Sequence, residues 1–311
     1  MTRTVRVHQS TWLADGVVRV ELRDPAGAAL PAWEPGAHLS LHLPNGLVRE
    51  YSLCGDPADG HSWTVAVLRE PSSRGGSAWV HKRLTPGTLI EVDGPRNNFA
   101  LEDATRHLLI AGGIGITPLL AMANHLEQRG SDWSMLYCGR SRSSMAFLGD
   151  LPADRVRVHA DDERGGPPDL AAGLAELRPG TLVYCCGPEP LIAAVEAALP
   201  DASMLRVERF RAPEPKTTGP DHGFDVVCGG SGRRVPVPAG VSILDALAGA
   251  GVSVPNSCRE GVCGTCETKV LAGEPEHRDF LLSDDEKAAG GTMLICVSRS
   301  RSAELVLDVE D

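Results

Sequence analysis

Short runs of alternating hydrophobic and polar residues fill the first part of the chain. In "AHLSLHLP" (37–44), Leu39, Leu41 and Leu43 fall on one face of an extended strand, and "SWTVAVLRE" (62–70) has the same period of two. Pro-Gly and Asn-Gly pairs separate these runs, as they do in turns between strands. The pattern predicts a small antiparallel β-barrel over residues 1–102.

The pattern changes near residue 104, where strand-like hydrophobic runs begin to alternate with segments of helical period. The strand-like runs are "RHLLIAGG" (106–113), "SMLYCGR" (134–140), "RVRVHA" (155–160) and "TLVYCCG" (181–187), and helical segments include "DLAAGLAEL" (169–177) and "PLIAAVEAAL" (190–199). This alternation predicts an α/β domain with a parallel sheet over residues 103–212. In its first helix, Thr117 is the predicted N-cap, Pro118 the first helical residue, and Gly130 lies just past the end.

A segment rich in proline, glycine and polar residues follows, "RAPEPKTTGPDH" (211–222). Such a composition is typical of linkers, and we place the linker at residues 213–222. A third unit of about 90 residues, 223–311, completes the chain and contains a cluster of cysteines.

Composition excludes several classes of function. With 311 residues the chain is long enough for two or three domains, and its net charge of -11 argues against nucleic acid or an anionic membrane as a partner. The start of the sequence lacks the basic and apolar regions of a signal peptide, and no hydrophobic run is long enough to span a bilayer. We therefore expect a cytoplasmic protein whose nine cysteines are ligands or core residues rather than disulfides.

The segment "CREGVCGTC" (258–266) contains the cysteine cluster. Its pattern is Cys258-x4-Cys263-x2-Cys266, and 29 residues separate the last of these from Cys296 in "LICVSRS". Four thiolates satisfy two irons, with three ligands from one loop and one from a distant segment, in the plant-type order. Gly261 and Gly264 would let the loop curl so that backbone N–H groups approach the cluster sulfurs.

Two other interpretations of the cysteines fit less well than an iron–sulfur cluster. A structural zinc site needs two Cys-x-x-Cys pairs, and only Cys263 and Cys266 form one. A purely structural role would leave three thiols crowded in one loop by chance. The remaining cysteines that lie outside recognisable motifs, Cys54, Cys138, Cys185 and Cys228, are predicted to be small buried hydrophobes.

Two motifs in the barrel region suit a phosphorylated, flat ligand. "REYSLCG" (49–55) offers Arg49 for a phosphate, with Tyr51 and Ser52 beside a planar ring. "RGGSAWVHKRL" (74–84) has two glycines and a serine before a short helix, where free N–H groups form a phosphate seat. Each motif alone also fits a bland alternative, an exposed strand in the first case and an ordinary glycine turn in the second.

Two further motifs lie in the α/β region. "AGGIGITP" (111–118) is a glycine-rich turn from strand to helix; it is not GxGxxG, but Gly112, Gly113 and Gly115 allow close approach of a pyrophosphate. "YCCGPEP" (184–190) ends another strand at the carboxyl edge of the predicted sheet, where ligands bind in such folds.

Taken in order, RxYSL, GGS, GGxGxTP and CGP resemble the motifs of the ferredoxin–NADP reductase superfamily. The segment 223–311 resembles a plant-type [2Fe–2S] ferredoxin, which implies a β-grasp fold, a mixed sheet crossed by a helix. The whole chain is similar to the phthalate dioxygenase reductase family, close to the vanillate O-demethylase reductases. This resemblance implies FMN rather than FAD, because the RGGS helix takes a terminal phosphate.

The resemblance also implies roles for individual residues. Thr117 and Cys186 would lie nearest the transferred hydride, and Arg49, Gly76 and Ser77 would hold the FMN phosphate. The full set implied for FMN is Arg49, Tyr51, Ser52, Leu53, Ala66, Val67, Gly75, Gly76, Ser77 and Phe210, of which Phe210 would cover the flavin or equally belong to a core. The set implied for NADH is Gly112, Gly113, Thr117, Pro118, Arg140, Cys186, Gly187 and Pro188. The cluster ligands are Cys258, Cys263, Cys266 and Cys296.

These parts form a redox chain. A nicotinamide gives up two electrons together as hydride and a cluster accepts one at a time, while a flavin can do both. No side-chain base is required, so His81, His107 and His159 are expected to be structural or exposed. The resemblance implies NADH, although Arg140 and Arg142 in "YCGRSRSS" (137–144) on charge alone favour NADPH.

The expected electron acceptor is a partner oxygenase, of the Rieske type or an O-demethylase. Alternatives are a cytochrome P450 as acceptor, or a free-flavin reductase whose C-terminal unit has no redox role. From residue 223 onward the chain has 14 acidic and 8 basic residues, a net charge of -6. Such a surface either docks a basic partner or serves solubility alone.

Overall fold

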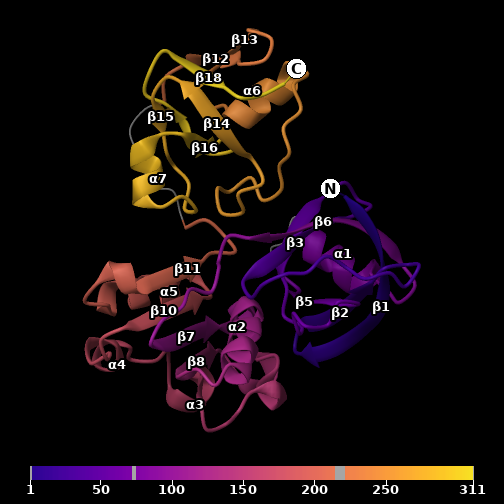
Figure 1. Cartoon of the computed structure of the whole chain (residues 1–311), viewed down its shortest axis with the longest axis vertical. Helices are drawn as coiled ribbons and strands as arrows, with labels where there is room; N and C mark the ends of the chain where they lie inside the picture. Colours follow the sequence, from indigo (N-terminus) through magenta and orange to yellow (C-terminus); the bar gives the residue numbers. More distant parts are fainter. Residues whose placement is uncertain (1, 72–74, 214–220, 311) are drawn as a thin grey trace. The chain divides into compact units, whose positions relative to one another are not determined.

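The computed structural model describes residues 2–71, 75–213 and 221–310. They form two compact units, Met1–Arg209 and Phe210–Asp311 (Figure 1). The predicted barrel and the predicted α/β region both lie in the first unit, and the ferredoxin-like region lies in the second.

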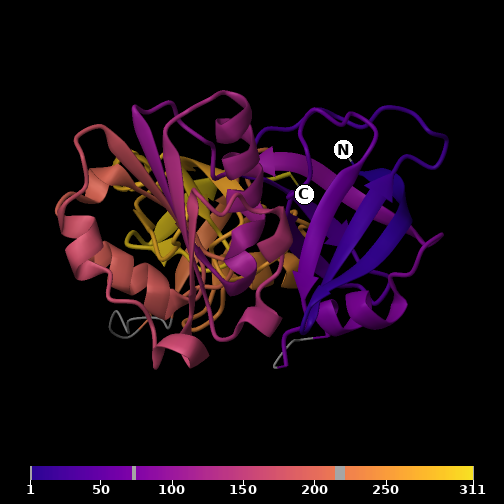
Figure 2. The same cartoon turned by 90° about the horizontal axis from the view of Figure 1, so that it is seen from below.

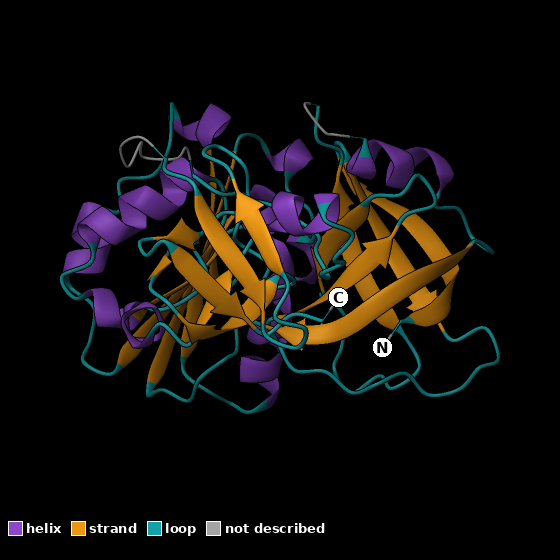
Figure 3. Ribbon diagram, turned by 90° about the horizontal axis from the view of Figure 1, so that it is seen from above, coloured by secondary structure: helices purple, strands orange, loops and turns teal. Residues whose placement is uncertain are grey.

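The N-terminal part of the first unit is an antiparallel sheet with the strand order β4-β3-β6-β1-β2-β5. Its elements are β1 (Arg3–Ala14), β2 (Val17–Arg23), β3 (Ala37–His42), β4 (Val48–Ser52), β5 (Trp63–Leu68), α1 (Gly76–Arg83) and β6 (Leu89–Asn97). A bridge between Leu53 and Val65 joins the two outer strands of this order, and Figure 3 shows the strands curving into a barrel wall. The predicted inward leucines Leu39, Leu41 and Leu43 are buried, as the alternation requires.

The C-terminal part of the first unit is a parallel sheet with the order β11-β10-β7-β8-β9. Its elements are β7 (Arg106–Gly112), η1 (Gly113–Gly115), α2 (Ile116–Gln128), β8 (Trp133–Gly139), η2 (Arg142–Ser144), η3 (Leu148–Asp150), β9 (Val156–Ala160), α3 (Asp161–Arg164), α4 (Ala171–Ala175), β10 (Thr181–Cys186), α5 (Glu189–Ala198), η4 (Ala202–Met204) and β11 (Leu205–Glu208). The parallel α/β prediction is confirmed.

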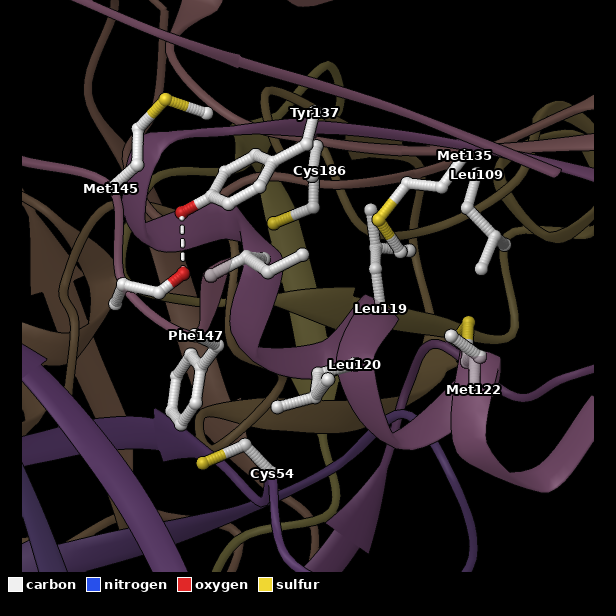
Figure 4. Close-up of a cluster of buried hydrophobic side chains, with 14 of the residues drawn as sticks. Cys54, Leu109, Leu119, Leu120, Met122, Met135, Tyr137, Met145, Phe147 and Cys186 are labelled. Atoms are coloured by element: carbon white, nitrogen blue, oxygen red, sulfur yellow. Dashed lines mark hydrogen bonds between the residues drawn. The ribbon is translucent and has the colours of Figure 1, made fainter. Parts of the chain in front are cut away.

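Helices cover both faces of this sheet (Figure 2). On one face, α2 packs Leu119, Leu120 and Met122 into a cluster with Tyr137 of β8, and Figure 4 shows the Tyr137 hydroxyl donating to the Ala146 carbonyl at 3.1 Å. On the other face of the sheet, α4 and α5 pack against the side chains of β7, β8 and β10 that point away from α2. Burial on both faces explains why these strands are continuous hydrophobic runs in the sequence.

The predicted N-cap at Thr117 is wrong. The 3₁₀ turn η1 runs directly into α2, so the cap position falls on Gly115, Thr117 is the second residue of the helix, and Pro118 is the third rather than the first. Its hydroxyl donates instead to the carbonyl of Ile114 at 3.0 Å. The C-terminal prediction holds, because Gly130 follows the helix end with a φ of 64°.

The second unit has a mixed sheet with the order β13-β12-β18-β14-β16, in which β12 and β18 are parallel and the other pairs antiparallel. Its elements are β12 (Phe224–Cys228), β13 (Arg234–Val237), α6 (Ile243–Gly249), β14 (Glu267–Ala272), β15 (Pro275–Glu276), α7 (Asp284–Ala289), β16 (Thr292–Leu294), β17 (Arg299–Ser300) and β18 (Glu304–Leu307). Ile243, Leu244 and Leu247 of α6 are buried in one core with the strands. This is the predicted β-grasp arrangement.

Most of the predicted linker lies outside the described residues, which omit 214–220. Its last residues are held by the second unit: Arg278 Nη2 lies 2.8 Å from Asp221 Oδ1, and Arg299 donates to the carbonyl of His222 at 2.9 Å. Within the described ranges, no helix has the length and hydrophobicity needed to cross a membrane.

Candidate redox sites

The predicted phosphate seat lies where α1 begins. Gly75 precedes the helix with a φ of 98°, and a Cβ built on Gly76 would lie 2.6 Å from Arg49 Nε. The arginine side chain therefore lies directly against the first residue of the helix. Ser77 Oγ accepts the Glu70 N–H at 3.1 Å, which leaves the hydroxyl proton for a further bond. A cation, a helix N-terminus and a hydroxyl are thus brought together, which suits a phosphate.

The residues predicted to line the flavin ring lie on β4 and β5, which the Leu53–Val65 bridge joins. Leu53 and Val67 are fully buried, and Ser52 and Ala66 are nearly so. Burial raises the pKa of the Tyr51 phenol, and the nearby Arg49 opposes this shift, so the hydroxyl stays neutral at physiological pH.

The two glycine-containing turns of the parallel sheet meet where the strand order reverses, between β7 and β10. A Cβ on Gly112 would lie 2.6 Å from Pro188 Cδ, and one on Gly115 would lie 2.2 Å from the Cys186 carbonyl oxygen. By contrast, Gly113 has a φ of 53°, and a Cβ there would have no neighbouring atom within 4 Å. The two turns therefore pack tightly against each other at Gly112 and Gly115, while the space beside Gly113 is open. Close approach of a pyrophosphate requires such an open position.

A carboxyl group joins the flavin side of the unit to the nucleotide side. Ser52 Oγ donates to Glu208 Oε2 at 3.4 Å, and the Cys186 thiol donates to the same oxygen at 4.0 Å. Burial raises the pKa of Glu208 to about 8, although the bond from Ser52 acts in the opposite direction. Burial, and then the charge of Glu208, raise the pKa of Cys186 well above the usual thiol value. Both the Glu208 carboxyl and the Cys186 thiol are therefore able to hold a proton at neutral pH.

Sequence reasoning missed Glu208. The residue lies in "ERF" (208–210), a segment for which only Phe210 was predicted to have a role. The available signal was an acid near the end of a strand-like run, and the structure shows that the edge strand β11 pairs with β10 and places Glu208 opposite Cys186. Phe210 itself is 40% exposed and belongs to the second unit, so its position over the flavin stays a prediction.

Other predicted residues have simple surroundings. Thr117 is 2% exposed, and Arg140 follows the end of β8 with its carbonyl accepting the Asp162 N–H at 3.1 Å. The three histidines expected to be structural each bond a backbone carbonyl: His81 to Val67, His107 to Glu102 and His159 to Gly166. Cys54, Cys138, Cys185 and Cys228 are buried, as predicted.

The four predicted cluster thiols form two pairs. A hydrogen bond from Cys263 lowers the pKa of Cys258, and a hydrogen bond from Cys296 lowers the pKa of Cys266. Backbone N–H groups also bond these sulfurs; the Glu260 N–H, for example, donates to Cys258 Sγ at 3.3 Å. Each thiol–thiol bond favours the thiolate of its acceptor, Cys258 or Cys266, and raises the pKa of its donor, Cys263 or Cys296.

The cluster loop depends on its glycines. Gly261 has a φ of 74°, and a Cβ there would lie 2.6 Å from Val297 Cγ2 and 3.2 Å from Asp279 Cα. The Phe280 N–H donates to the Gly261 carbonyl at 3.0 Å, which fixes the loop to the segment after β15. Gly264 also has a positive φ, of 75°.

The paired arrangement fits a two-iron cluster better than a single metal ion. Each iron of a [2Fe–2S] cluster takes two protein thiolates, and the thiols pair as Cys258/Cys263 within the loop and as Cys266 of the loop with the distant Cys296. Within the part of the chain that the structure describes, no three His, Cys, Asp or Glu side chains are grouped to hold one metal ion.

Known proteins resemble the whole chain. The family model described as "2Fe-2S iron-sulfur cluster binding domain" matches residues 226–301, which include all four cluster cysteines. The phenoxybenzoate dioxygenase subunit beta of Ectopseudomonas oleovorans is 49% identical over 98% of this chain and 97% of its own length. The phthalate dioxygenase reductase of Burkholderia cepacia is 39% identical over 96% of this chain and 94% of its own length.

Solved structures show the same likeness. A crystal structure of phthalate dioxygenase reductase, titled as a modular structure for electron transfer from pyridine nucleotides to [2Fe–2S], matches 99% of this chain and 98% of that chain with 37% identity and a TM-score of 0.73. An intact type IV self-sufficient cytochrome P450 monooxygenase matches 99% of this chain with 44% identity and a TM-score of 0.91. This chain spans only 41% of that longer protein. On identity, coverage and fold together, the chain belongs to the phthalate dioxygenase reductase family, oxidoreductases with FMN, NADH and a [2Fe–2S] cluster as cofactors.

Proposed function

We propose that this chain is the reductase component of an oxygenase system, carrying electrons from NADH to a terminal oxygenase. We assign FMN binding to residues 1–102, NADH binding to 103–212 and the cluster to 223–311, joined by a linker at 213–222. Bound FMN supplies the chemistry that converts a two-electron hydride into single electrons.

The observation that carries this proposal is the convergence of Ser52, Cys186 and Glu208. Ser52 ends the flavin strand β4, and Cys186 ends the nucleotide strand β10. Both side chains hydrogen-bond the same oxygen of Glu208. The ends of β4 and β10 are therefore bridged by the side chain of a single residue. A nicotinamide held at Cys186 and a ring held at Ser52 would therefore meet, and the neutral thiol and protonated carboxyl would add no negative charge to the reacting pair.

The assignments of individual ligands follow from the surroundings already described. Arg49, Gly75, Gly76 and Ser77 would bind the FMN phosphate, while Tyr51, Ser52, Leu53, Ala66 and Val67 would line the ring. Gly112, Gly113, Thr117, Pro118, Arg140, Cys186, Gly187 and Pro188 would bind NADH, with Thr117 and Cys186 nearest the hydride. Cys258 and Cys263 would hold one iron, and Cys266 and Cys296 the other.

The names of relatives support an oxygenase as the acceptor. They include a vanillate O-demethylase oxidoreductase from Pseudomonas at 41% identity and a carnitine monooxygenase reductase subunit from Escherichia coli at 41%. We infer a Rieske-type oxygenase or O-demethylase. A cytochrome P450 is the second candidate, because the match with a TM-score of 0.91 is part of a P450 monooxygenase. A cytoplasmic location is part of the proposal, since none of the nine cysteines, all within the described residues, forms a disulfide.

Two experiments test these proposals. Purified protein should show flavin and [2Fe–2S] absorption together, and NADH should drive it to reduce a one-electron acceptor protein. A colourless protein containing zinc would contradict the proposal. To identify the acceptor, the reductase is mixed with a Rieske oxygenase or with a P450, each with its own substrate, and product formed per NADH is measured. Tight coupling to the P450 alone would replace the first candidate with the second.

A further inference from the structure

An ion pair lies beside the proposed nucleotide site and bears on the choice of nucleotide. We propose that Glu163 determines the preference for NADH over NADPH by engaging Arg142. The proposal rests on the proposed function of the parallel sheet as the nucleotide site. It also resolves a conflict in the sequence, where two arginines favour NADPH and the family resemblance implies NADH.

The position of the pair follows from the strand order. Gly113 and Pro188 follow the adjacent strands β7 and β10, at the point where the order reverses. A dinucleotide bound across that point extends its adenosine half over the next strands on the β7 side, which are β8 and β9. Arg142 opens the turn η2 after β8, and Glu163 lies in α3, directly after β9. Both residues therefore lie on the side of the sheet where the ribose of the adenosine half would be bound.

The contact between them is direct. Arg142 Nε donates to Glu163 Oε1 at 2.8 Å, and each side chain is about half exposed, at 52% and 46%. The two segments are also joined by their backbones, because the Asp162 N–H donates to the Arg140 carbonyl. The short helix α3 is thus positioned to present Glu163 to Arg142.

The charge of this pair selects against a 2′-phosphate. A phosphate is bound best by an arginine that offers two N–H groups in a fork, but one edge of the Arg142 guanidinium is already occupied by Glu163. The carboxylate would also lie close to the incoming phosphate and repel it. A ribose hydroxyl carries no charge and is free to donate to Glu163 and accept from Arg142.

The other charges nearby do not replace Arg142. Arg140 and Arg164 are the adjacent cations, and Asp161 and Asp162 are the adjacent anions, so the surroundings of the pair are close to neutral. Arg142 also lines a cavity of about 330 Å³ whose lining includes a second carboxylate, that of Asp150. A dianionic phosphate would therefore meet a cation already balanced by acids.

The experiment uses the full-length, FMN-loaded protein and two small probes, 2′-AMP and 5′-AMP. Binding of each is measured by calorimetry for wild type, Glu163→Gln and Asp162→Asn. In Glu163→Gln, 2′-AMP should bind roughly tenfold more tightly, since one carboxylate charge beside the phosphate is removed. Asp162→Asn removes the same charge from the neighbouring residue without touching Arg142, and should change 2′-AMP binding by less than about threefold. In the double variant Arg142→Ala/Glu163→Gln, the gain should disappear.

Steady-state measurements provide a second readout. With a two-electron dye as acceptor, the ratio of kcat/KM for NADPH to that for NADH should rise about tenfold in Glu163→Gln. Equal gains in Glu163→Gln and Asp162→Asn, or a gain that survives loss of Arg142, would overturn the role of the pair. If neither nucleotide fragment competes with NADH in the wild-type protein, the proposed nucleotide site itself fails.

Discussion

The flavin–nucleotide region and the cluster loop are assembled in opposite ways. Three of the four proposed cluster ligands lie within nine residues, and glycines and backbone N–H groups of the same loop shape the site. The flavin–nucleotide site draws Arg49 from β4, Ser77 from α1, Cys186 from β10 and Glu208 from β11. One site is therefore fixed by local spacing, and the other by how distant strands pair and pack.

This difference predicts how each site fails. A change in the cluster loop should remove one cofactor and leave the other, because the sites lie in separate compact units. A change at the meeting point of β7 and β10 should disturb several functions at once, because the same backbone positions more than one group.

The largest effect is expected for Cys263→Ser. A hydroxyl is a poor substitute for a thiolate on iron, so the cluster should be lost while FMN stays bound. NADH oxidation with a two-electron dye should continue, whereas the rate with a one-electron acceptor protein should fall by more than ~100-fold. Replacing a residue that only hydrogen-bonds to a metal ligand typically costs ~10–100-fold, and Cys263 would be a ligand itself. Iron content, flavin content and both rates measure this. The control is Cys228→Ala, a buried cysteine in the same unit that should keep its cluster; parallel loss of both rates in Cys263→Ser would contradict the separation.

The converse variant removes the phosphate seat. In Arg49→Ala/Ser77→Ala, loss of a charged and a neutral hydrogen bond should weaken FMN binding by about 100-fold. Flavin retained after gel filtration and the FMN Kd are the measurements, and iron content should not change. Lys82→Ala, at the other end of the same helix, is the matched control. Full flavin retention in the double variant would remove Arg49 and Ser77 from the site.

Gly115→Ala tests the contact between the two turns. Its Cβ would lie 2.2 Å from the Cys186 carbonyl, so the backbone must move, and the free energy of unfolding should fall by about 1–3 kcal/mol. Gly149→Ala is the control, because no atom lies within 4 Å of that Cβ; it should change stability by less than about 0.5 kcal/mol. Urea denaturation followed by fluorescence distinguishes them, and equal stability of the two variants would show that the turns do not pack as described.

For a change of one pH unit, the smallest expected effect on stability concerns Glu208. Its pKa is near 4.5 in an unfolded chain and about 8 in the folded protein. Between these values the unfolded state releases the proton and the folded state retains it, so rising pH favours unfolding, by at most about 1.4 kcal/mol per pH unit. Glu208→Gln should make Tm less sensitive to pH between about 5 and 8. An identical pH profile for the variant and the wild type would show that the carboxyl titrates normally.

The sequence was most informative where structure is local. Alternation placed Leu39 and Leu41 in the barrel core, and the spacing of Cys258, Cys263 and Cys266 indicated the loop that bonds their sulfurs. Both depend only on neighbours along the chain. The same holds for Gly130, whose positive φ ends α2.

The errors and omissions arose where distant segments meet. Thr117 followed by Pro118 is a pattern typical of a helix start, but the 3₁₀ turn over Gly113–Gly115 already leads into the helix one residue earlier. Glu208 was missed because its role depends on the pairing of β10 with β11 and on the approach of Ser52. The ion pair of Arg142 with Glu163 joins two turns that are 21 residues apart, and no periodicity predicts such a contact.

The central proposal, that electrons pass from NADH through FMN to the cluster within one chain, is tested most directly by anaerobic reduction. The full-length protein is mixed with NADH and followed by visible absorption and by electron paramagnetic resonance at low temperature. The proposal predicts bleaching of the flavin and then a signal from the reduced cluster, with only the first event in Cys263→Ser. A cluster that stays oxidised in the wild-type protein while NADH is consumed would contradict it.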